Sequence, residues 1–120
     1  MIWNARFHPD FKREFRELDE DVQDHIFACV NCLEQFGPEF GRPRVDTLNG
    51  SKHANMKELR FKVKIGVWRV AFAFDPDRSA ILLVAGDKEG EKEVRFYKTL
   101  IAIADQRFDQ WLSHAKRKKP

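Results

Sequence analysis

The stretch that decides the fold is MKELRFKVKIGVWRVAFAF, residues 56–74. Its side chains alternate with a period of two, which predicts two antiparallel strands joined by a tight turn. One face of this hairpin is apolar and the other is basic. The apolar face holds Leu59, Phe61, Val63, Trp68, Val70, Phe72 and Phe74, and the basic face holds Arg60, Lys62, Lys64 and Arg69.

The basic face predicts a site for a polyanion. If Ile65-Gly66 forms the two-residue loop, Lys62 lies opposite Arg69, and cations that face one another across a strand pair repel. Glu58, at the far end, is the one acid in this row. The neighbouring side chains are small, Ala71 and Ala73, so we expect open space beside the cations and a concave surface.

Composition sets broad limits on this interpretation. The 120 residues predict one domain, 1–120, and the eleven Phe and three Trp supply a large core. The net charge of +3 is compatible with nucleic acid but does not require it. With two cysteines, no signal peptide and no apolar run of membrane-spanning length, we expect a soluble, cytoplasmic protein with no membrane partner.

Hydrophobic periodicity predicts the remaining elements. A strand over residues 2–7 is followed by a short helix from Pro9 and a second helix that begins near Asp19. Residues 80–85 form an apolar run typical of an interior strand, and a helix ends the chain before a basic tail at residues 116–120. The predicted fold is α+β, in the order β-α-α-β-β-β-α, with a helical hairpin against a mostly antiparallel four-stranded sheet.

A long loop is predicted between the second helix and the hairpin. Residues 37–55 contain three of the six glycines, with Val45 and Leu48 as expected anchors. The loop brings Lys52 and His53 to the start of the basic hairpin. Long loops in compact domains are often functional, but a solvated connector is an equal alternative on these grounds alone.

Four segments together resemble a known family. They are GRPRVDTLNGSKHANMKELRF at 41–61, GVWRVAFAFDP at 66–76, AILLVAGDK at 80–88 and FYKTLIAIADQRF at 96–108. The chain is identified from them as similar to the phage-derived HigB-like branch of the RelE/ParE toxin superfamily. The resemblance covers nearly the whole chain.

This resemblance implies a toxin of a type II toxin-antitoxin pair, neutralised by a helix-turn-helix, HigA-like antitoxin. RelE and HigB toxins cut mRNA in the ribosomal A site without a metal, so the resemblance implies an endoribonuclease with no metal and no cofactor. Such cleavage uses the 2′-hydroxyl of the substrate as nucleophile, and the protein must activate it, neutralise the phosphorane-like transition state and protonate the leaving group.

Catalytic residues are carried over motif by motif. Arg69, in GVWRV, matches the arginine that contacts the scissile phosphate, and a planar fork facing open space suits that role. The alternative is an arginine paired with Glu58. Arg60, in ELR, is similar to a second family arginine with a positioning or charge-stabilising role. Lys88, in AGDK, falls where the family carries a basic residue.

The proton-transfer residues are left open by the resemblance. Tyr97 and Lys98 stand where the family places a late aromatic or basic residue, and Tyr97 could stack on a base, assist proton transfer or belong to the core. His53 and Lys57 lie near the His and Lys of HigB toxins. Either His53 or Lys57 could be the general base. RelE has lysines at the positions of Met56 and Glu58, which this chain lacks, and Lys57, Lys62 or Lys52 could replace them. The candidates for RNA binding are Lys52, Lys62, Lys64 and Lys98.

Two other functions remain open at this point. A ParE-like inhibitor of DNA gyrase would use the same fold without RNA chemistry. A non-cleaving, nucleic-acid-binding regulatory module would keep the basic face without a working general base.

Overall fold

The computed structural model describes residues 3–118, with side chains described for 3–115, so the side chains of the predicted basic tail at 116–120 lie outside it. No helix of the described part is long and apolar enough to cross a bilayer. The elements in order are β1 (Asn4–Phe7), α1 (Pro9–Phe15), α2 (Glu20–Phe36), the 3-10 helix η1 (Gly37–Glu39), β2 (Val45–Thr47), β3 (Lys57–Val63), β4 (Gly66–Phe74), β5 (Ser79–Asp87) and α3 (Glu93–Lys118).

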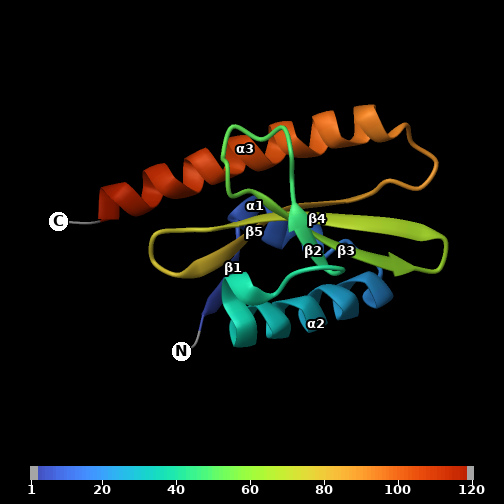
Figure 1. The fold of residues 1–120 in the computed structure, drawn as a ribbon, viewed down its shortest axis with the longest axis horizontal. Coiled ribbons are helices and arrows are strands. Elements are labelled where there is room, and N and C mark those ends of the chain that lie inside the picture. The colour runs from blue at the N-terminus through green and yellow to red at the C-terminus, as the bar shows by residue number, and fades with distance from the viewer. Residues whose placement is uncertain (1–2, 119–120) are drawn as a thin grey trace.

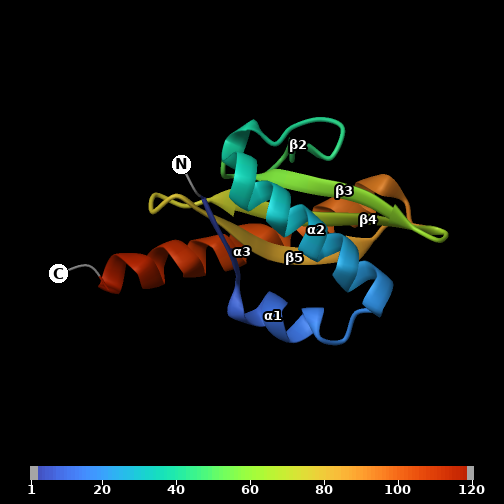
Figure 2. The same cartoon turned by 90° about the horizontal axis from the view of Figure 1, so that it is seen from below.

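One mixed sheet lies between two helical layers. Its strand order is β1-β5-β4-β3-β2, in which β1 is parallel to β5 and the other pairs are antiparallel. Helices α1 and α2 cover one face and α3 crosses the other (Figures 1 and 2). The predicted α+β fold and helical hairpin are therefore confirmed.

The prediction of four strands is wrong by one, because part of the long loop joins the sheet. Val45–Thr47 pairs with β3, placing Val45 opposite Leu59 and Thr47 opposite Lys57. Three residues are too few to establish a period of two, and the flanking Gly and Pro residues favour a loop. The expected anchors, Val45 and Leu48, are both buried.

The hairpin register also differs from the prediction. Val63 pairs with Gly66, so the two-residue loop is Lys64-Ile65, and Lys64 adopts a positive φ of 55°. Arg60 therefore lies directly opposite Arg69. Because the shift is by two positions along one strand, every side chain keeps its predicted face.

The basic face of the hairpin is covered in part, contrary to the expected open space. Ala71 and Ala73 are 0% and 1% exposed and belong to a core cluster with Phe96, Leu100 and Ala104 of α3. The small alanine side chains let the helix approach the sheet closely. The larger residues of the other face, including Leu59, Phe61 and Phe72, pack against α1 and α2.

Gly86 sets the approach of the first turns of α3. It pairs with Arg69 in the sheet, and a Cβ built on it would lie 2.9 Å from Cε1 of Phe96, which is buried. A side chain at this position would force the helix and the strand apart. The sequence therefore allows α3 to place its side chains directly above Arg69.

We predict that Gly86→Ala lowers the free energy of unfolding by about 1–3 kcal/mol, the usual cost of overpacking. Gly41→Ala is the matched control, since its Cβ would meet only the backbone oxygen of Glu39 at 3.8 Å, and we expect a change within about 0.5 kcal/mol. Urea titration followed by circular dichroism measures both. Equal stability of the two variants would contradict this account of helix packing.

Candidate functional site

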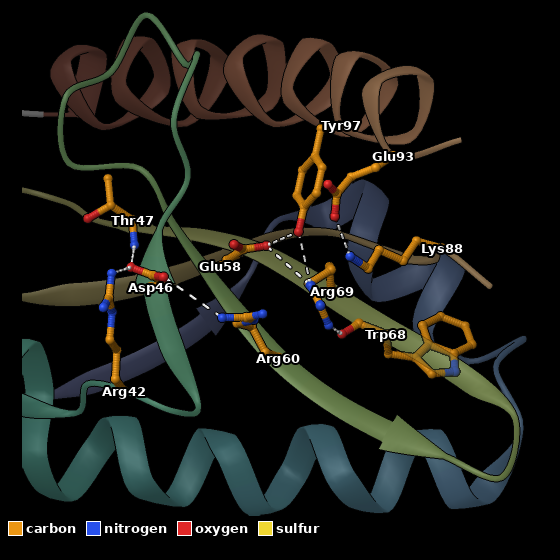
Figure 3. Close-up of polar contacts among 10 residues, drawn as sticks. All are labelled: Arg42, Asp46, Thr47, Glu58, Arg60, Trp68, Arg69, Lys88, Glu93 and Tyr97. Atoms are coloured by element: carbon orange, nitrogen blue, oxygen red, sulfur yellow. Dashed lines mark hydrogen bonds and ion pairs between the residues drawn. The ribbon is translucent and has the colours of Figure 1, made fainter. Parts of the chain in front are cut away.

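A groove of about 820 Å³ lies between α3 and the β2 edge of the sheet. One wall is made of β2 and the residues after it, 46–50, and the other of the first turns of α3. Glu58 and Arg60 of β3 form the floor between them. We call this hollow the α3 groove; Figure 3 draws polar contacts in and around it.

Arg69, Tyr97 and Glu58 form a connected cluster at the bottom of the α3 groove (Figure 3). Nε of Arg69 donates to the Tyr97 hydroxyl oxygen at 3.0 Å, and that hydroxyl donates to Oε1 of Glu58 at 2.8 Å. The same Nε lies 3.5 Å from Oε1 of Glu58, and Nη1 donates to the carbonyl oxygen of Trp68 at 2.9 Å. The cluster joins β3, β4 and α3.

The predicted open setting of Arg69 is wrong. Its side chain is only 7% exposed and its ion pair with Glu58 is the alternative that the sequence left open. The strands alone place Arg69 beside small residues, but α3 closes over that space. Arg69 thus lies beneath the floor of the groove and holds the two groups that do line it, Glu58 and Tyr97.

Tyr97 is held in its neutral form. Burial, and then the hydrogen bond to the Glu58 carboxylate, raise the pKa of the phenol above its ordinary value, while the bond from Arg69 opposes this rise. At neutral pH the hydroxyl therefore keeps its proton and donates a hydrogen bond to Glu58. Glu58 is in this way the acceptor at the end of the cluster.

Arg60 is the accessible arginine of the α3 groove. Its side chain is 41% exposed, and Nη1 lies 3.8 Å from Oδ2 of Asp46, too far for a hydrogen bond. The Asp46 carboxylate also accepts from the backbone N–H of Thr47, which is the main reason its pKa is lowered, and from Arg42. This loose pairing leaves Arg60 able to bind another anion.

Lysines extend the positive charge along α3. Lys88 donates from Nζ to Oε1 of Glu93 at 2.7 Å and lies 5.6 Å from the centre of the Tyr97 ring. This contact lowers the pKa of Glu93. Lys98 is exposed and lines the groove. The structure thus brings together five predicted residues: Arg60, Arg69, Lys88, Tyr97 and Lys98.

His53 and Lys52 belong to the loop before β3 and contact α3 away from the α3 groove. Nε2 of His53 is 2.9 Å from Oδ1 of Asp109, and Lys52 forms an ion pair with the same carboxylate. Asp109 follows Tyr97 by about 18 Å along the helix, at about 1.5 Å per residue. Both residues attach the loop before β3 to α3, and Figure 1 shows this loop running beside the helix. Neither residue lines the α3 groove.

The other predicted lysines are also dispersed. Lys57 points to the opposite face of the sheet from Arg60, and its Nζ lies 3.5 Å from Oγ1 of Thr47. Lys64 stands at the hairpin tip, 3.5 Å from Oδ2 of Asp21. Lys62 is exposed on the same face as Arg60. Only Lys62 of these three shares a face with the cluster.

The site contains more carboxylates than the sequence predicted. Glu58 precedes Arg60 by two residues, and this spacing in a strand places both on one face, so the signal was present. Asp46 gave no signal, because it depends on the unpredicted strand β2. Glu93 reaches Lys88 through the turn that leads into α3. The cations of the α3 groove are consequently balanced by three carboxylates.

Comparisons with known proteins agree with this architecture. Residues 13–109 match the model of the family described as phage derived protein Gp49-like. A Mycobacterium tuberculosis chain named as an inferred toxin, HigB3, is 45% identical over 105 residues, which cover 88% of this chain and 90% of that relative. The chain belongs to this Gp49-like family, as a relative of HigB toxins. The predicted resemblance is confirmed.

Further relatives of this HigB-like chain support the same fold. A second M. tuberculosis relative named as an inferred toxin, HigB2, is 43% identical over 105 residues, covering 86% of this chain but 51% of its own length. A mutant of the E. coli toxin RelE in the free state superposes with a TM-score of 0.54 at 13% identity, over 85% of this chain and 96% of RelE. A chain of an archaeal RelE-RelB complex from Pyrococcus horikoshii superposes with a TM-score of 0.54 at 14% identity, over 75% of this chain and 99% of that chain.

We predict that Tyr97 ionises above 10.0, its ordinary pKa, and that Glu58→Gln lowers this pKa relative to the wild type by removing the carboxylate that accepts the phenolic proton. Tyr97 is the one tyrosine of the sequence, so the absorbance change of phenolate formation reports it alone. The Lys64→Ala variant, changed at the hairpin tip, should titrate as the wild type does. An unshifted pKa in Glu58→Gln would contradict the cluster.

Proposed function

We propose that this HigB-like toxin is a metal-independent, ribosome-dependent endoribonuclease that cuts mRNA and thereby inhibits translation. The observation that carries the proposal is the α3 groove, where a carboxylate, a neutral phenol and an accessible arginine meet. RNA cleavage needs a proton acceptor for the 2′-hydroxyl and positive charge at the phosphate. The groove offers both within one connected set of side chains.

Glu58 is our candidate for the general base. It lines the groove and accepts a hydrogen bond from the Tyr97 hydroxyl. A 2′-hydroxyl bound in the groove could donate a hydrogen bond to the same carboxylate. Arg69 acts as a positioning residue, because it is buried and holds both Glu58 and Tyr97. This assignment replaces direct contact between Arg69 and the phosphate.

Arg60 and Lys98 are our candidates for binding the scissile phosphate. Both are accessible in the groove, and the weak partner of Arg60, Asp46, can be exchanged for a phosphate. Lys88 adds charge near Tyr97 and is released for an anion when its exposed ion pair with Glu93 opens. Tyr97 presents its ring to the groove, where a base can stack.

A neutralising antitoxin is the expected partner of this toxin. The chain belongs to a family of toxins, and RelE, with which it shares its fold, occurs in a complex with RelB. We propose a helix-turn-helix, HigA-like antitoxin and action in the cytoplasm, where ribosomes and messengers are present.

The function is tested by inducible expression in bacteria with primer extension on an abundant messenger. We predict growth arrest and new cleavage sites with the wild type, about a 10²–10⁴-fold loss of cleavage with Glu58→Gln, the usual worth of a general base, and about a 10²-fold loss with Arg60→Ala. Lys64→Ala, outside the groove, is the control and should cleave as the wild type does.

The other outcomes discriminate between the alternatives. Arrest with intact messengers and damaged DNA would indicate gyrase inhibition. No arrest from soluble protein would favour a non-cleaving module. Cleavage by the purified toxin on programmed ribosomes is compared before and after bound metal is removed from the toxin with EDTA and the toxin is returned to the assay buffer. We expect equal cleavage, and a loss of activity after the EDTA treatment would contradict metal independence.

A further inference from the structure

A second hollow lies on the other side of the molecule from the α3 groove. It has a volume of about 550 Å³ and is formed where β1, α1, α2 and the later part of α3 meet. We call it the β1-α1 groove. It shares no lining residue with the α3 groove, and its Trp111 follows Tyr97 by about 21 Å along α3, at about 1.5 Å per residue. Aromatic side chains form its interior: Phe7, Phe15, Phe27 and Trp111.

Phe27 is the exposed member of the aromatic lining, and contacts within the protein orient both Phe27 and Trp111. Phe27 is 51% exposed, and its ring lies edge-on to Phe15 with 5.0 Å between the centres. The indole N–H of Trp111 donates to Oδ2 of Asp75 at 3.0 Å, which sets the orientation of its ring. A large exposed aromatic beside an apolar hollow is typical of a surface that another protein covers.

The rim of the β1-α1 groove carries positive charge without compensation. Arg6, Lys12 and Arg16 line it, and none of them forms an ion pair among the side chains described for residues 3–115. Lys12 and Arg16 are one helical turn apart, a spacing at which like charges repel. An unpaired set of this kind is suited to an acidic partner.

The two acids of α1 are occupied elsewhere. On α1, Asp10 pairs with Arg13, and Glu14 accepts from Nη1 and Nη2 of Arg107 at 2.8 and 2.6 Å. Arg107 also donates to the carbonyl oxygen of Leu83, which fixes α1 against α3 and β5. The acids of α1 are thereby paired with Arg13 and Arg107, and Lys12 and Arg16 remain at the groove without an acid of α1.

We propose that the β1-α1 groove binds an acidic segment of the antitoxin, with apolar side chains between Phe27 and Trp111 and carboxylates on Lys12 and Arg16. The existence of an antitoxin rests on the proposed function; the location and chemistry of its contact rest on the groove. RNA fits less well, since the interior is aromatic and mainly apolar while the cations stand only at the rim. A partner bound here leaves the α3 groove unfilled and acts by preventing entry to the ribosome.

The test uses the toxin and, as the probe, the helix-turn-helix protein encoded by the adjacent gene. Lys12→Glu with Arg16→Glu should still arrest growth but should no longer be rescued by co-expression of the probe. In solution we expect the affinity to fall at least about 100-fold, as each lost contact between desolvated opposite charges is costly. Phe27→Ser, at an exposed position, should weaken binding as well.

Lys92→Glu with Arg95→Glu is the matched control, because it reverses two exposed cations outside both grooves and should bind the probe as the wild type does. Toxicity of the Lys12→Glu, Arg16→Glu variant shows at once that the variant folds. Rescue of that variant with unchanged affinity would overturn the docking surface and leave the proposed function intact.

Four further outcomes would also overturn the proposal. A folded Lys12→Glu, Arg16→Glu variant that binds the probe normally but is not toxic would indicate a contact with RNA or the ribosome. A wild-type homodimer that this variant dissolves would indicate a second copy in the groove. A wild type that arrests growth without binding the probe contradicts the docking alone, whereas one that does neither contradicts the proposed function as well.

Discussion

The close packing of α3 on the sheet is the constraint on which the candidate site depends. Ala71, Ala73 and Gly86 offer almost no side-chain volume beneath the helix, and Phe96 occupies the space that a Cβ on Gly86 would need. Tyr97 can reach Glu58 and Arg69 only at this distance. The small residues beneath the helix therefore create a buried contact in place of the predicted open space, and the α3 groove opens beside it.

Charge compensation follows from the same packing. A buried guanidinium needs a partner, and Arg69 has the Glu58 carboxylate and two oxygen atoms, of Tyr97 and of Trp68. At the accessible edge, Arg60 stands loosely beside Asp46. The site thus contains a rigid, balanced part and an adaptable part. This division fits our proposal that Arg69 positions the reacting groups while Arg60 meets the phosphate.

The sequence predicted what periodicity and turn chemistry control. The hairpin faces, the helical hairpin and the interior strand at residues 80–85 all follow from local pattern, and they are confirmed. The sequence did not predict the features that depend on contacts between residues far apart in the chain. The burial of Arg69 depends on Tyr97, and the wall of the α3 groove depends on β2, whose three residues carry no pattern. His53 and Lys57 seemed to accompany the arginines because they precede them closely, but a helix and a strand direct them elsewhere.

The central claim is that Glu58 performs chemistry while Arg60 binds substrate. Single-turnover cleavage of a messenger on programmed ribosomes, measured over a range of toxin concentrations, separates the two. We predict that Glu58→Gln lowers the maximal rate by about 10²–10⁴-fold with little change in the half-saturating concentration. A maximal rate equal to that of the wild type would contradict the account.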